Sequence, residues 1–205
     1  NNIFFKVNLQ TDFDPSKSSN ELKCTEGFFK PNYSVEPIHT IHDVPKFYLP
    51  MHKCMNETIS YKERISTFGD HRPLWAVYGE YDFIPRQRWL HSLEHGAIVV
   101  LYHPCADLTE VEKLKDLVRS CLYRHIITPY KELSKERPIA LVAWANSLEV
   151  GFSDEQIIID FVKKFAKQGP EKVSKQGQYN KMLKKKAELV SDIDDSQICP
   201  KSSRM

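Results

Sequence analysis

The middle of the chain alternates short apolar runs with segments whose apolar residues recur at helical spacing. Three apolar runs, over 97–102, 126–128 and 139–144, predict strands of one buried sheet. The segments 110–122 and 154–167 have their apolar residues on one face, which predicts two amphipathic helices. This order is typical of an α/β (α+β) domain. We expect a ferredoxin-like split βαβ sheet with helices on one face and a loop-rich N-terminal cap.

Capping signals place the starts of the two helices. Thr109 and Glu112 have the spacing of a capping box, in which each side chain binds the other's backbone N–H. They predict the start of the helix at 110–122. Ser153 stands directly before the helix at 154–167 and is expected to cap it with its hydroxyl.

The two ends of the chain follow a less regular pattern. Residues 1–65 are expected to form an irregular arm with short strands, the first of them over 3–9, and residues 1–35 are the N-terminal arm that precedes the domain. Four prolines between positions 31 and 50 exclude long regular elements there. Residues 36–172 are then a single α/β domain. Residues 173–205 are rich in Lys and Gln, and we expect an exposed helix over 172–190 followed by a loose tail.

Composition narrows the class of protein. Of the 205 residues, 41% are hydrophobic, which suffices for a core and excludes global disorder. The net charge is only +2, so no nucleic-acid partner is expected. Every apolar run is far shorter than the roughly 20 residues of a membrane span, so we expect no span within this chain. The sequence names neither a protein partner nor a small-molecule partner.

Two features favour a secreted or lumenal location. Asn32 and Asn56 each begin a glycosylation sequon. In an oxidising compartment we expect one or two disulfides and at least one cysteine left over. The alternative is a set of buried or inert thiols in a cytosolic protein. The five cysteines are Cys24, Cys54, Cys105, Cys121 and Cys199.

The clearest candidate chemistry lies in a predicted helix that begins near Pro85 and runs to His95, with Gly96 as its C-terminal cap. His91 and His95 lie four residues apart, on one face, and can reach a common ion. Glu94 is close enough to bind the ion or to act as a general base. The pattern H-x-x-E-H also occurs in inverzincin metallopeptidases, but those need a long helix, whereas a buried strand follows Gly96 at once. The alternative is two histidines that only stabilise the end of a helix.

A turn over residues 69–73 supplies the third candidate donor. Its glycine and proline fix the backbone path, and His71 lies at the tip. The aromatic residues that follow could shield a metal from solvent. The alternative is a turn histidine that is hydrogen-bonded to backbone. These aromatic residues are Trp75, Tyr78, Tyr81 and Trp89.

Residues 69–81 and 91–102 together resemble domain of unknown function family 3105. The shared pattern is a glycine-x-histidine turn, a G-x-Y element and a histidine-x-leucine-glutamate-histidine-glycine core before a strand. The resemblance covers about residues 36–172, and residues 102–105 look like the animal branch. Members occur in bacterial extracytoplasmic proteins and in animal secretory-pathway membrane proteins. The resemblance implies no activity. It does imply that four residues belong to one constellation: His71, His91, Glu94 and His95.

The resemblance also implies a histidine upstream in the arm. His39, His42 and His52 compete for that place, and we favour His42 as the fourth donor. Three imidazoles suit copper or zinc. We favour copper, because the arm supplies Met51 and the compartment is expected to lie outside the cytosol.

Three functions therefore stay open. The first is an extracytoplasmic metal-binding protein, with or without metal-dependent oxidoreductase chemistry. The second is a structural or adhesion-type ectodomain without catalysis. A metal-dependent hydrolase is the least favoured, with Glu94 as its catalytic residue.

Overall fold

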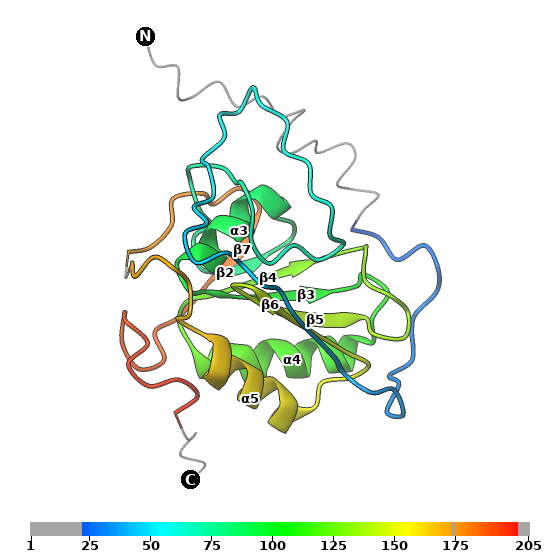
Figure 1. Ribbon diagram of the computed structural model, residues 1–205. Coiled ribbons are helices and arrows are strands. Elements are labelled where there is room, and N and C mark those ends of the chain that lie inside the picture. Colours follow the sequence, from blue (N-terminus) through cyan, green and yellow to red (C-terminus); the bar gives the residue numbers. More distant parts are fainter. Residues whose placement is uncertain (1–21, 174, 201–205) are drawn as a thin grey trace.

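The computed structural model describes residues 22–173 and 175–200, so the strand predicted over 3–9 lies outside the described residues. In the described part, strands form one mixed seven-stranded sheet in the order β1-β6-β5-β3-β4-β2-β7 (Figure 1). The fold is of the mixed α+β class that the sequence predicts. The strands are β1 (Ile38–Ile41), β2 (Gly79–Tyr81), β3 (Ile98–Tyr102), β4 (His125–Pro129), β5 (Ile139–Ala143), β6 (Asn146–Val150) and β7 (Leu183–Lys186), and the helices are α3 (Arg86–Glu94), α4 (Leu108–Cys121) and α5 (Glu155–Phe165).

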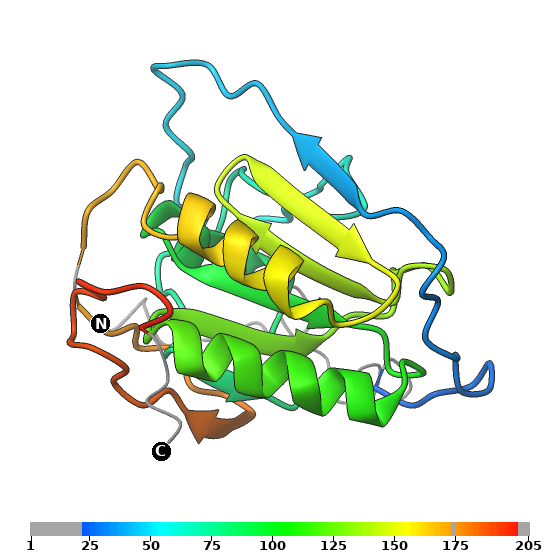
Figure 2. The same ribbon diagram turned by 90° about the horizontal axis from the view of Figure 1, so that it is seen from below.

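The sheet is covered on both faces. Helices α4 and α5 lie side by side on one face (Figure 2), and α3 lies on the other face below the loops of the arm (Figure 1). Residues of β3 alternate between two apolar clusters, so that Val99 and Leu101 pack on the α3 side and Val100 packs on the side of α4 and α5. Burial on both faces explains why the central strands are continuous apolar runs.

The strand order differs from the expected split βαβ arrangement. Strands β3 and β4, which α4 connects, pair with each other directly and in parallel. In a split unit another strand would lie between them. Here the hairpin of β5 and β6 is added at the other edge of β3, where β5 pairs antiparallel.

Strand β6 was not predicted because its sequence is polar. Asn146, Ser147 and Glu149 are nevertheless buried in it. Glu149 accepts two hydrogen bonds of 2.7 Å from Arg64 of the arm, which compensates its burial. The hairpin turn also lacks a signal, since Ala145 takes the left-handed conformation (φ 60°) that usually requires Gly or Asn.

Both predicted helix caps are wrong by one or two residues. Helix α4 starts after Asp107, whose carboxylate accepts from the backbone N–H groups of Thr109 and Glu110. Helix α5 is capped by Asp154, and the Ser153 hydroxyl instead donates to the Glu110 carbonyl. In both cases an aspartate one or two residues from the predicted cap satisfies free N–H groups at the start of the helix.

The predicted helix over 172–190 is wrong. The described residues of this segment contain no helix, and β7 pairs antiparallel with β2 at the edge of the sheet. Three consecutive lysines on an edge strand discourage pairing with another chain, because their charges repel an approaching strand. The described part of the tail is not loose either, because the Asp195 carboxylate is buried and pairs with Arg124 at 3.1 Å.

Two disulfides fasten the ends of the chain to the domain. Cys24 of the arm is bonded to Cys105, and Cys199 of the tail is bonded to Cys121. Cys54 is exposed and unpaired. This confirms the expectation of one or two disulfides with a cysteine left over. The helices within the described residues are all too short or too polar to cross a membrane.

Candidate metal centre

Helix α3 supplies two of the candidate side chains. It buries Trp89 and Leu93 in the core, and it ends at His95, its C-cap residue. Gly96 follows with φ +78°, and a side chain there would collide with the backbone of Lys167. The chain must therefore leave the helix at this point. His91 and His95, four residues apart, lie one helical turn from each other, with their ring centroids 4.8 Å apart.

The turn before α3 fixes His71. Its side chain is completely buried, and its Nδ1 lies 2.9 Å from the Gly69 carbonyl oxygen. The Tyr61 hydroxyl donates to the next carbonyl, that of Asp70, at 2.6 Å. The ring of His71 lies 4.4 Å from the ring of His91, between centroids.

The hydrogen bonds set the tautomer of both rings. A carbonyl oxygen only accepts, so Nδ1 of His71 donates to Gly69, and Nδ1 of His91 donates to the Arg72 carbonyl at 2.7 Å. In a neutral imidazole this leaves Nε2 with a free lone pair. Burial, and then the neighbouring His71, lowers the pKa of His91 to about 3. The ring is therefore neutral at pH 7, as a metal donor must be.

The arm brings a third imidazole to this place. His52 and His71 form a parallel β-bridge, in which Lys53 N–H donates to the His71 carbonyl and His71 N–H donates to the Met51 carbonyl. The ring of His52 lies 5.1 Å from that of His71 and 4.7 Å from that of His91, between centroids. His52 is the exposed member of the cluster.

Four side chains converge. Ligand atoms of His52, His71, His91 and Glu94 all lie within 4.8 Å of one another. Glu94 Oε2 is 3.1 Å from His71 Nε2, yet this nitrogen makes no hydrogen bond in the described structure. Donors about 2.0–2.2 Å from a tetrahedral ion lie about 3.4 Å from one another. Small side-chain movements would therefore suffice for all four to share one ion.

His95 lies beside the four but outside their set. It is buried, and neither ring nitrogen has a hydrogen-bond partner among the described residues. Its Nδ1 is 3.4 Å from a Glu171 carboxylate oxygen, and its ring packs 4.6 Å from Trp75. Burial lowers the pKa of His95 to about 4. It is a further neutral imidazole next to the cluster.

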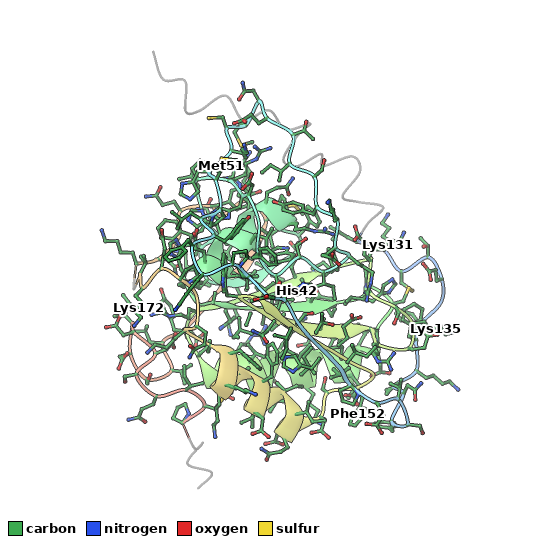
Figure 3. The ribbon with its side chains drawn as sticks, in the orientation of Figure 1. His42, Met51, Lys131, Lys135, Phe152 and Lys172 are labelled. Carbon is green, nitrogen blue, oxygen red and sulfur yellow. A yellow bond between two sulfur atoms is a disulfide. The ribbon has the colours of Figure 1, made fainter. Side chains whose placement is uncertain are left out.

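The structure places His42 elsewhere. Its ring packs on Phe68 at a centroid distance of 6.0 Å, and Figure 3 shows it well apart from Met51, the neighbour of His52. The arm therefore contributes His52 to the cluster, although the sequence favours His42. No local signal could have separated them, because the bridge to His71 joins distant segments.

The remaining histidines have hydrogen-bond partners outside the cluster, and those of His103 and His125 are local, as expected. His103 Nδ1 accepts a hydrogen bond from the Cys105 N–H at 3.0 Å, and His125 Nδ1 lies 2.8 Å from the Leu122 carbonyl oxygen. His39 Nε2 lies 3.1 Å from the Asn146 side-chain oxygen.

The sulfur atoms of the arm face cations. Met55 Sδ accepts a hydrogen bond from Arg88 at 3.2 Å. Met51 is 55% exposed, and its Sδ lies 3.9 Å from the Lys53 ammonium. The converging set is made of three imidazoles and one carboxylate.

Residues 169–171 pack against the backbone of Glu94. Glu171 N–H donates to the Glu94 carbonyl at 3.1 Å, and a side chain at Gly169 would collide with that same carbonyl. This contact gives the Gly169-Pro170-Glu171 sequence a physical role, since it packs against the end of α3 that carries Glu94 and His95.

The family model described as "Protein of unknown function (DUF3105)" matches residues 52–178, more than half of the chain. The match begins at His52 and includes the other three converging residues, whereas His42 lies outside it. Comparison with the curated proteins and with the solved structures gave no match. The chain therefore belongs to the DUF3105 family of proteins of unknown function.

Proposed function

We propose that this protein binds one transition-metal ion outside the cytoplasm, through His52, His71, His91 and Glu94. One observation carries the proposal. Two buried imidazoles donate Nδ1–H to backbone carbonyls, which leaves Nε2 of each neutral ring available to a metal, and Nε2 of His71 lies 3.1 Å from the buried Glu94 carboxylate. Metal-binding histidines are typically oriented in this way by their second nitrogen. Burying these groups only to fill the core would leave polar atoms without partners, which is costly.

The donor set suits zinc and copper alike. Three imidazoles and one carboxylate are ligands that both ions accept. Methionine sulfur would favour copper, but the Met51 sulfur accepts a contact of 3.9 Å from the Lys53 ammonium. Copper keeps the advantage that the Irving–Williams order gives it wherever it is available. Elemental analysis distinguishes the two ions.

Four protein donors fill a tetrahedral ion, as in sites that hold a metal without catalysis. Oxidoreductase or hydrolytic chemistry needs a free position for water or substrate. His52 is the exposed donor, so its departure from the ion would create that position. Glu94 could serve as a general base only from outside the donor set. His95 is the nearest further imidazole. We therefore propose metal binding as the function, with oxidoreductase chemistry dependent on release of His52.

The proposed location outside the cytoplasm is supported by the two disulfides, which are compatible with an extracellular protein. Asn56 is also exposed, as glycosylation of its sequon requires. Protein made in a eukaryotic secretory host should therefore carry a glycan at Asn56 and two disulfides, which an intact mass without reduction will show. Five free thiols without glycan would place the protein in the cytosol.

Elemental analysis tests the proposed metal. The protein should be purified from the secretory host without chelators or metal-affinity tags and measured for zinc, copper, iron and manganese. We expect about one equivalent of one transition metal per chain. A parent protein that contains no metal, and takes up none after dialysis against Zn²⁺ or Cu²⁺, would leave the structural ectodomain as the better account.

A further inference from the structure

Arg72 is a completely buried arginine directly after His71 in the turn. Its guanidinium donates to the carbonyl of Glu57 at 2.8 Å, to that of Lys53 at 3.2 Å, and to that of Cys54. All three acceptors belong to the loop that follows His52. The rigid fork of a guanidinium can hold several carbonyls in a fixed geometry, which an ammonium cannot.

The backbone of Arg72 is attached to α3 at the same time. Its N–H donates to the Gln87 carbonyl at 3.0 Å, and its carbonyl accepts the Nδ1–H of His91 at 2.7 Å. One residue therefore touches the segments that carry three of the proposed donors. The turn therefore contacts the arm before and after His52. The Asp70 carboxylate accepts from the Met51 N–H, and the Arg72 guanidinium donates to carbonyls after His52.

We propose that Arg72 is the positioning residue that makes His52 a metal donor, so that the number of donors at the ion depends on its guanidinium. The inference rests on the proposed metal site. It follows from the exposure of His52 and the burial of the other donors. His71, His91 and Glu94 are held by the turn and by α3, whereas His52 lies on an exposed loop that its bridge to His71 joins to them and that the guanidinium of Arg72 holds in the residues after the bridge.

The test uses Co²⁺ as a spectroscopic probe in the full chain, made metal-free by chelation and reloaded. The parent protein is compared with His52→Ala, Arg72→Lys and the double variant. The visible absorption of Co²⁺ reports its coordination, and a competing chelator reports affinity. We expect His52→Ala and Arg72→Lys to change the spectrum in the same direction. Arg72→Lys should weaken binding about 10- to 100-fold, as is typical for partners that orient a donor.

The double variant decides whether Arg72 acts through His52. If it does, Arg72→Lys causes no further loss of affinity in the His52→Ala background, because the donor it positions is already gone. Additive losses, or a parent-like spectrum for Arg72→Lys, would overturn the inference. Arg119→Lys is the matched control, since Arg119 of α4 is a partly buried arginine that pairs with Glu80 of β2, and the spectrum of this variant should match that of the parent.

Two further outcomes are separable. A parent protein that takes up no Co²⁺ overturns the proposed metal site, and the inference with it. If Arg72→Lys does not fold, hydrogen exchange of the metal-free parent replaces it. The guanidinium protons of Arg72 should then exchange more slowly than those of an arginine in an unstructured chain, because the carbonyls of the loop after His52 accept them before metal binds. Exchange at the unstructured rate would overturn the inference.

Discussion

His91→Ala is expected to lower metal affinity by more than about 100-fold, which exceeds the loss typical for a residue that only orients a metal donor. His91 is buried at the centre of the cluster, and its ring lies within 5.1 Å of the rings of His52, His71, His95 and Trp75, between centroids. Its replacement removes one of the four converging donors. The sheet and the helices α4 and α5 pack without it, so circular dichroism should stay unchanged. Metal content after dialysis and a chelator competition measure the effect.

His42→Ala is the matched control, because it removes another arm histidine whose ring packs on Phe68. It should keep the metal content and the affinity of the parent. Loss of metal from His42→Ala together with full retention by His91→Ala would place the site elsewhere in the chain.

Removal of the Cys121–Cys199 disulfide is expected to cost about 4 kcal/mol of unfolding free energy. The bond closes a loop with a sequence separation of 78 residues, and long loops restrict the unfolded chain most. It also lies close to a buried contact that fastens the tail, in which Asp195 pairs with Arg124. Urea unfolding of Cys121→Ser/Cys199→Ser without reductant measures the loss.

Cys54→Ser is the control for that variant, since Cys54 is exposed and unpaired. Its free energy of unfolding should stay within about 0.5 kcal/mol of the parent, as is usual for surface substitutions. A loss below about 1 kcal/mol in the double serine variant would contradict the pairing. Metal binding should survive in both variants, because neither bond nor thiol belongs to the converging set.

The central strands could be predicted because burial on both faces leaves continuous apolar runs, as in β3 and β5. Strand β6 could not, since its buried polar groups find partners such as Arg64 that only the folded chain supplies. Strand β7 has the composition of an exposed helix, and only its pairing with β2 makes it a strand. Propensity is overridden by tertiary contacts in both cases.

The candidate site divides in the same way. The spacing of His91 and Glu94 on one helix, and the rigid turn of His71, are local features, and the sequence predicts these three residues. The choice of His52 over His42 depends on a bridge between the arm and the turn, 19 residues apart, and on the guanidinium of Arg72. Such pairing between irregular segments has no periodic signature.

A crystal structure of the metal-loaded protein, with anomalous diffraction measured at the absorption edge of the bound metal, tests the proposed site most directly. The account predicts one anomalous peak per chain. The peak should lie about 2.0–2.2 Å from Nε2 of His71 and of His91, from an imidazole nitrogen of His52 and from a Glu94 carboxylate oxygen. A peak bound by other side chains, or no peak in protein shown to contain the metal, would contradict it.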